Sequence, residues 1–436
     1  MWKYRCKSHL LALIIAFGIG LVVSFILFSS GLNADVDVFT SSLQSMTSSG
    51  VSSEAIEESI NFLKNNTWIL YIADSFFIAG IINVIYLSQY LTSKFTMSPF
   101  IIMCLIFIFP EQMILLGAIL VIPSVILCIY GIVTLQSDLS FQRKKYNFND
   151  DDELVRIYKI HHKLDDSQEQ VAKTCRKNVT NLSLVYGLGI VALLFILIFV
   201  SNMWILMFAI MFYVFAFNLV LRYRATCLIP ISKLLYDDCN PEACASAIIY
   251  YSTKRNGHVK LTQHALLAQS LIYLNDPELA QDVLVSYPRK DSNSILQYYT
   301  IMSYIDYMLK DEDGLARCKE EAQKIRMNYG HPGIMIQSEE IMAIENKIHL
   351  MDGDFNTCKK YYLQGLQRAR FAFQQVDSCY YIALISFVEE DYKLASMYFE
   401  KVVELGNTMF FVEKAKTYLE KINAMNIPND EEEYLL

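Results

Sequence analysis

Four long apolar blocks constrain this chain most strongly, because each is long enough to cross a lipid bilayer, which takes about 20 predominantly apolar residues. These blocks are residues 10–28, 68–88, 99–135 and 182–221. The last two are too long for one helix, and each contains a polar break, at 110–112 and at 201–203. We therefore expect each of them to form a helical hairpin, which gives six membrane spans.

The positions of lysine and arginine test this topology, because they concentrate on the cytosolic side of membrane proteins. Six spans place four basic clusters in the cytosol, at residues 3–7, 143–145, 176–177 and 222–224. The loop 30–67 holds five acidic residues and one lysine, and it is predicted to lie outside. Both termini are then cytosolic. Two alternatives stay open. The third segment could be re-entrant, since only about 16 residues separate Thr96 from the polar break at 110–112. The first span could instead be a signal peptide that is cleaved after Ala34.

Composition agrees with a membrane protein that carries a soluble part. Hydrophobic residues make up 54% of the 436 residues and charged residues 19%, against about 45–50% and 25% in soluble domains. Residues 227–436 carry a net charge of −9, whereas residues 1–226 carry +1. An acidic soluble half argues against a nucleic-acid partner. None of the ten cysteines falls in the outside loop, so we expect no disulfide framework.

A repeated turn organises the second half of the chain. An Asp or Asn at each turn is expected to cap the second helix of a helical pair, and a small residue follows where the two helices cross closely. The small residues are Cys244, Ala280, Ala316, Cys358 and Ala395, spaced by 36, 36, 42 and 37 residues. Such a period in helical sequence predicts an α-solenoid.

The last repeat resembles a tetratricopeptide (TPR) repeat. Ala383, Asp391-Tyr392, Ala395 and Phe399 follow the family's spacing, and Gly353-Asp354-Phe355 matches its Gly-Asp-Tyr turn. The resemblance covers about 227–424 and implies a groove that binds peptides or partner helices. The family's basic peptide clamp is not evident, so no ligand-gripping residues are carried over.

The predicted fold is all-α: a polytopic membrane domain of about six spans followed by a TPR-like solenoid. Its expected parts are a four-span unit 1–135, a connector 136–181 with one amphipathic helix, a two-span hairpin 182–222, the repeats 227–424 and an acidic tail 425–436.

Few residues suggest chemistry. Asp74, Asn83 and Glu111 are the polar candidates of the membrane half, because an ionisable residue in a span is a functional hypothesis by default. His161 and His162 lie near Asp165 and Asp166, but adjacent histidines are expected to point to different sides of a helix. We therefore expect no metal site, no cofactor and no catalytic residues.

The predicted function is that of a non-enzymatic adaptor. The solenoid would bind a cytosolic or membrane protein through a groove near Ala268, Tyr304 and Ala383, and its net charge favours a basic partner segment. The alternative is a transporter or channel that the solenoid regulates, with Asp74, Asn83, Asn202 and Asn218 lining the pore. Composition suggests a bacterial plasma membrane, and no oligomeric state is assigned.

Overall fold

The structure is a computed structural model. It describes residues 2–29, 68–95, 108–146, 148, 150–199, 219–325, 327 and 331–425, with isolated residues in 58–66 and 209–216. The chain divides into two compact units. Unit 1 comprises Met1–Asp138 with Leu193–Phe208, and unit 2 comprises Leu139–Ala192 with Ala209–Leu436.

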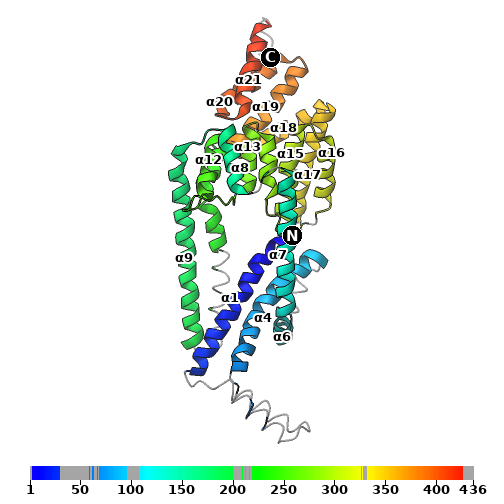
Figure 1. The fold of residues 1–436 in the computed structure, drawn as a ribbon. Coiled ribbons are helices and arrows are strands. Elements are labelled where there is room, and N and C mark those ends of the chain that lie inside the picture. The colour runs from blue at the N-terminus through cyan, green and yellow to red at the C-terminus, as the bar shows by residue number, and fades with distance from the viewer. Residues whose placement is uncertain are drawn as a thin grey trace. The chain divides into compact units, whose positions relative to one another are not determined.

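Unit 1 is built from long apolar helices (Figure 1). They are α1 (Trp2–Ser29), α4 (Trp68–Phe95), α6 (Pro110–Ile119) and the greater part of α7 (Val121–Lys145). Three helical segments are long and apolar enough to cross a membrane: Trp2–Phe25, Tyr71–Ser88 and Val121–Lys145. The first half of the chain therefore holds three candidate spans among the described residues, where the sequence predicted six. Of the remaining predicted span residues, 99–107 and most of 200–218 lie outside the described part of the chain, whereas 182–199 are described as part of the long helix that begins at Glu169 and are not among the candidate spans.

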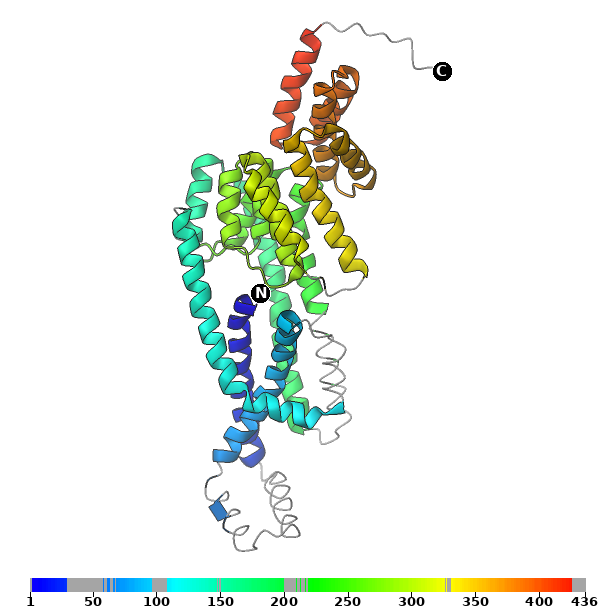
Figure 2. The same cartoon turned by 90° about the vertical axis from the view of Figure 1, so that its right-hand side faces the viewer.

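The block 99–135 contains a second break that was not predicted from the sequence. Pro110 occupies the first turn of α6, as the polar break suggested, but the helix ends again at Leu120 and α7 begins at Val121. Pro123 explains this second break, because its ring clashes with the carbonyl of Ile119 and it has no N–H to donate. As a result, α6 lies across the direction of α7 (Figure 2).

Glycines allow the helices of unit 1 to approach closely. A Cβ on Gly20 of α1 would lie 2.5 Å from Cα of Ser75 on α4. A Cβ on Gly117 of α6 would clash with the carbonyl oxygen of Gly80 on α4. Small residues at such crossings are typical of membrane helices, which associate mainly through close packing and interhelical hydrogen bonds.

Unit 2 is all-helical in the part that the structure describes, and each helix from α11 onward packs on the next. Its helices are α8 (Asp151–His161), η2 (Asp166–Gln168), the greater part of α9 (Glu169–Phe199), α11 (Ile229–Tyr236), α12 (Pro241–Ser252), α13 (His264–Tyr273), α14 (Pro277–Val285), α15 (Ser292–Leu309), α16 (Glu312–Gln323), α17 (His331–Asp352), α18 (Phe355–Arg368), α19 (Ala372–Val388), α20 (Tyr392–Leu405) and α21 (Phe410–Ala424). This sequential pairing is consistent with a repeat.

One turn geometry recurs five times between the paired helices. A residue with positive φ follows the first helix within three residues, and the next residue caps the second helix with its side chain. The positive-φ residues are Cys239, Asn275, Lys310, Gly353 and Glu390, and the caps are Asn240, Asp276, Asp311, Asp354 and Asp391. In four turns the N–H of the cap also bonds to a carbonyl five residues earlier, as Asp391 does with Ser386 at 2.9 Å. The turn thus satisfies the end of one helix and the start of the next.

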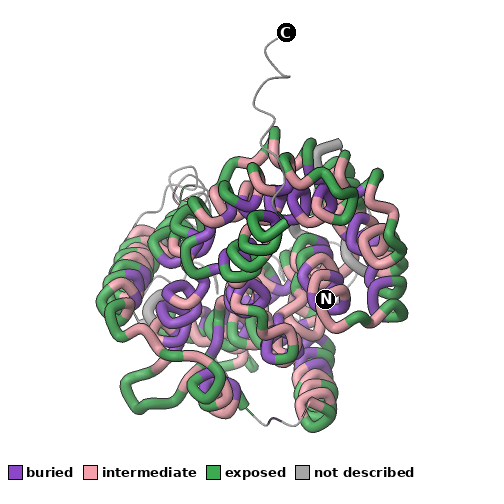
Figure 3. Tube along the Cα trace, turned by 90° about the horizontal axis from the view of Figure 1, so that it is seen from above, coloured by how far each residue is buried: buried purple, intermediate pink, exposed green. Residues whose placement is uncertain are grey.

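The third repeat departs from the expected register. Its cap is Asp311, so the position four residues later is the buried Leu315, and Ala316 is exposed instead of lying at the helix crossing. The close approach is made by Gly314, where a Cβ would lie 2.7 Å from the carboxyl carbon of Asp306. The other small residues, Cys244, Ala280, Cys358 and Ala395, are fully buried together with Phe399. Figure 3 shows the same division of each helix into a buried and an exposed side.

The helical stack curls until its first and last repeats touch. Helix α11 packs against α19, and Asn407 donates a hydrogen bond to the carbonyl of Asp238 at 2.8 Å. Tyr273 of α13 lies edge-on to Phe411 of α21, with ring centroids 5.9 Å apart. The inner face of the stack is therefore largely filled by its own side chains.

Candidate functional site

A groove remains open in unit 2 at the carboxyl ends of α13, α15 and α17. Its volume is about 760 Å³. Helices α19 and α21 form its other side. The lining residues are Asn275, Tyr307, Met308, Lys310, Glu312, Leu350, Met351, Tyr380, Tyr381, Leu384, Phe410, Phe411, Lys414, Thr417, Tyr418 and Lys421. The groove thus combines aromatic and aliphatic walls with a few charged groups, as ligand and peptide sites commonly do.

The charged lining of this groove is mainly basic, in contrast to the net charge of the solenoid. Among the described residues it holds three lysines and one glutamate. The ammonium of Lys414 lies 4.7 Å from the ring centroid of Phe410, and that of Lys421 lies 5.2 Å from that of Tyr418. Burial lowers the pKa of Lys414. Lys310 follows the carboxyl end of α15, where its charge offsets the partial negative charge of the helix.

A buried lysine lies behind the groove wall. Lys347 of α17 is 6% exposed, and its ammonium lies 3.7 Å from the ring centroid of Tyr304 and 4.3 Å from that of Tyr381. It donates a hydrogen bond to the hydroxyl of Tyr362 at 3.1 Å. Tyr381 also lines the groove, so one face of this aromatic cage belongs to the groove wall.

The cage is closed by an acidic residue. Asp377 accepts a hydrogen bond from the hydroxyl of Tyr304 at 2.8 Å. Burial lowers the pKa of Lys347 to about 8, while the negative charge of Asp377 opposes this change. Burial raises the pKa of Asp377, and the positive charge of Lys347 opposes this rise. Lys347 was not among the residues singled out from the sequence. The available signal was its position three residues after Ile344, which is buried in the structure.

The three residues expected near the groove floor lie in different surroundings. Ala268 and Ala383 are fully buried in the core, because the stack curls and fills its inner face. Tyr304 is partly buried and belongs to the Lys347 cage, next to the groove wall. The partner groove expected from the sequence stays a prediction, and the observed opening lies beside these residues.

Two of the polar candidates in the membrane half bond to neighbouring helices. Asp74 of α4 accepts a hydrogen bond from the hydroxyl of Ser24 on α1 at 2.8 Å. The amide of Asn83 donates to the carbonyl of Gly117 at 2.9 Å. Glu111 lies in the first turn of α6, and its side chain is outside the described part, as are Asn202 and Asn218.

A histidine that was not singled out from the sequence joins the same region of unit 1. His9 of α1 lies 3.1 Å from the amide oxygen of Asn83 and stacks on Tyr86 with ring centroids 4.1 Å apart. Its other ring nitrogen lies 3.4 Å from Sγ of Cys128. His9 also lines a small pocket of about 50 Å³ between α1, α4 and α7. The signal in the sequence that could have found His9 was its position directly before the apolar block 10–28.

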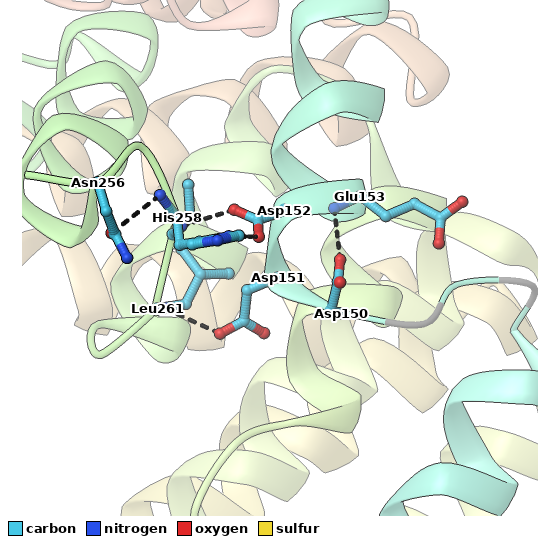
Figure 4. Close-up of polar contacts among 8 residues, drawn as sticks. Asp150, Asp151, Asp152, Glu153, Asn256, His258 and Leu261 are labelled. Atoms are coloured by element: carbon cyan, nitrogen blue, oxygen red, sulfur yellow. Dashed lines mark hydrogen bonds and ion pairs between the residues drawn. The ribbon is translucent and has the colours of Figure 1, made fainter. Parts of the chain in front are cut away.

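The connector helix α8 is fixed to the first repeat by its acidic start (Figure 4). Asp152 accepts a hydrogen bond from the backbone N–H of Val259 at 2.6 Å and pairs with His258 at 2.9 Å. Asp151 accepts from the backbone N–H of Leu261 at 3.0 Å. The apolar face of α8, with Leu154 and its neighbours, is buried on the solenoid.

The other end of α8 brings together two histidines and an aspartate. Oδ2 of Asp276 lies 2.7 Å from Nδ1 of His161 and 3.0 Å from Nε2 of His162. The expectation that the two rings diverge is wrong, because α8 ends at His161 and His162 adopts an extended conformation (φ −132°, ψ 153°). Both rings can therefore reach one carboxylate.

Comparison with known proteins gives no match for this chain: no family model, no curated protein and no solved structure is similar to it.

Proposed function

We propose that this chain is a membrane-anchored scaffold whose TPR-like helices bind a segment of another protein at the cytosolic face of a bacterial plasma membrane, without catalysing a reaction. The observation that carries the proposal is the groove of about 760 Å³, which combines aromatic walls with three lysines. Membrane anchoring would raise the effective concentration of any partner that is itself held at the membrane.

The groove favours a partner segment that is acidic and contains aromatic or aliphatic side chains. The net charge of residues 227–436 alone favours a basic partner. The described part of the groove lining, however, holds three lysines and one glutamate. Lysines placed over aromatic rings, as Lys414 and Lys421 are, present their charge at the groove surface while their stems cover the rings. Such charges steer an acidic partner and lose strength as salt rises.

A photo-crosslinking residue at Thr417 tests this proposal in cells that express the full chain. Thr417 lines the groove, whereas Lys416 on the same helix is exposed and lies outside it, so a crosslinker at 416 is the matched control. We expect a defined partner at 417 and not at 416, crosslinked through an acidic segment.

Charge reversal gives the second readout. Lys414→Glu with Lys421→Glu should lower crosslinking or affinity by about tenfold or more, since like charges then face each other. Lys401→Glu with Lys416→Glu changes the net charge equally at exposed positions outside the groove lining. Equal yields from the two double variants, or a basic partner segment, would contradict the proposed site.

The alternative function, a transporter or channel regulated by the solenoid, is supported by the polar cluster of His9, Asn83 and Cys128 within the candidate spans. Asp74→Asn distinguishes the two functions. A transporter that uses this carboxylate should lose flux, whereas a scaffold should retain partner crosslinking at 417, because an asparagine can still accept the hydrogen bond of Ser24.

A further inference from the structure

The convergence of His161, His162 and Asp276 is independent of the groove. Their ligand atoms, Nδ1, Nε2 and Oδ2, all lie within 4.8 Å of one another. The two histidines come from the end of α8, and the aspartate is the N-cap of α14 in the second repeat. We propose that these three side chains form a binding site for Zn²⁺ or a chemically similar divalent transition metal.

The donor set selects this class of metal. Two imidazole nitrogens and one carboxylate oxygen suit zinc and its neighbours, whereas calcium and magnesium take mainly oxygen ligands. Three protein ligands leave a fourth tetrahedral position for water. In tetrahedral zinc sites the ligand atoms lie roughly 3.3 Å apart, as zinc–ligand bonds of about 2.0–2.1 Å require. The two separations from Oδ2 of Asp276, 2.7 and 3.0 Å, need to lengthen by a few tenths of an ångström, and the two ring nitrogens, which lie within 4.8 Å of each other, need to settle near 3.3 Å.

The aspartate is held in place for this role. Oδ1 of Asp276 accepts a hydrogen bond from the backbone N–H of Leu279 at 3.2 Å, which caps α14. This bond directs Oδ2 toward the two rings. The side chains of His162 and Asp276 are 17% and 11% exposed, whereas His161 at 44% leaves an entry path for an ion.

A metal at this position would tie the connector helix α8 to the second repeat, in addition to the contacts of its acidic start with the first repeat. Without a metal, the same groups form a hydrogen-bonded cluster. The two states differ in one measurable respect, since metal binding displaces the ring protons that point at Oδ2.

The test is titration of the untagged, chelator-treated full chain in detergent with Co²⁺, followed by displacement with Zn²⁺. We expect one Co²⁺ per chain, with an absorption spectrum of tetrahedral nitrogen and oxygen ligands. Asp276→Asn removes the carboxylate but keeps the helix cap, because asparagine caps as well as aspartate does. This variant and His162→Gln should each weaken binding by at least about tenfold.

His258→Gln is the matched control (Figure 4). The ring of His258 also pairs with an aspartate, but Asp152 is its single ion-pair partner among the residues that the structure describes. This variant should bind Co²⁺ as the unmodified chain does.

Equal binding by Asp276→Asn and the unmodified chain would overturn the proposal. So would a thiolate-to-cobalt charge-transfer band, since it would place the metal at cysteines. The proposed groove is unaffected by either result, because crosslinking at 417 does not depend on this site.

Discussion

At the scale of single residues, the positive-φ turn is the feature that most consistently shapes unit 2. Five first helices are followed by a residue in this conformation, and only Gly353 is a glycine among these five residues. A residue with a Cβ is disfavoured by about 1 kcal/mol or more in the left-handed region. Four repeats therefore accept a local cost, which the capping aspartate or asparagine that follows partly offsets.

Glu390→Gly is expected to raise the free energy of unfolding by about 1 kcal/mol, because glycine adopts φ 63° without steric cost. The reciprocal change, Gly353→Ala, is expected to lower it by a similar amount, since Gly353 has φ 77°. Thermal unfolding of the full chain in detergent measures both. If the two variants shift the transition in the same direction, backbone conformation does not govern these turns.

The buried carboxyl of Asp306 gives unit 2 a predictable pH response. It is 4% exposed, accepts a hydrogen bond from the thiol of Cys318, and has a pKa raised to about 6 from its usual 3.8, chiefly by burial. Because the folded state binds this proton more tightly than the unfolded state, stability falls as pH rises from about 4 to 6 and stays lower above that range. The penalty at pH 7 is about 3 kcal/mol.

Asp306→Asn removes that ionisation and should stabilise the protein at pH 7 by up to about 3 kcal/mol, less any loss in the contact with Cys318. The difference between variant and unmodified chain should vanish near pH 4, where both side chains are neutral in the folded state. Denaturant unfolding at the two pH values checks this. A difference that is the same at both pH values would show that packing, and not charge, is responsible.

At the scale of helices, close crossings define unit 1. Gly20 of α1 lies at one such crossing, whereas a Cβ on Gly18 of the same helix would meet no described atom within 4 Å apart from the neighbouring part of its own helix. Gly20→Ala should therefore push α1 from α4 and lower thermal stability in detergent. Gly18→Ala should be neutral or slightly stabilising, because alanine favours a helix by about 1 kcal/mol over glycine. Equal effects of the two substitutions would show that the α1–α4 crossing tolerates a methyl group.

The helices and caps of unit 2 could be predicted from sequence because both depend on local signals. The 3.6-residue period and an Asp or Asn before each second helix located four of the five turns. The turn of the third repeat is shifted, because its cap is Asp311 and not a residue of the segment 312–316. The curling of the stack depends on contacts between repeats far apart, such as α11 with α19, and no local pattern reports them. For the same reason Ala268 and Ala383 were expected near a groove but lie in the core.

The candidate sites, too, could be predicted from the sequence only in part. The pair His161-His162 was visible in the sequence, but its convergence on Asp276 requires the end of α8 at His161 and the cap of a helix more than a hundred residues later. Lys347 and its tyrosines come from α15, α17, α18 and α19, so only the fold brings them together. Residue type thus indicates possible ligands and charges, whereas their grouping depends on tertiary structure.

At the scale of the whole molecule, the number of spans decides on which side of the membrane the groove lies. The three candidate spans alone would place the N-terminus and the residues after Lys145 on opposite sides. Six spans would place both in the cytosol, with Arg143, Lys144 and Lys145 at the cytosolic end of α7. The positive-inside rule favours the second arrangement, since three adjacent basic residues are costly to move across a membrane.

Reporter fusions to the full chain test this topology directly. A reporter that is active only in the cytosol, inserted after Tyr146 or after Met425, should be active at both positions, and one inserted within the loop 30–67 should be inactive. Activity at neither 146 nor 425 would mean that α8 and the helical repeats face outward. The proposed cytosolic partner would then be wrong, although the groove itself could still bind a partner outside the cell. Activity at 425 but not at 146 would reverse the orientation of α7 and require an odd number of spans between α7 and the repeats.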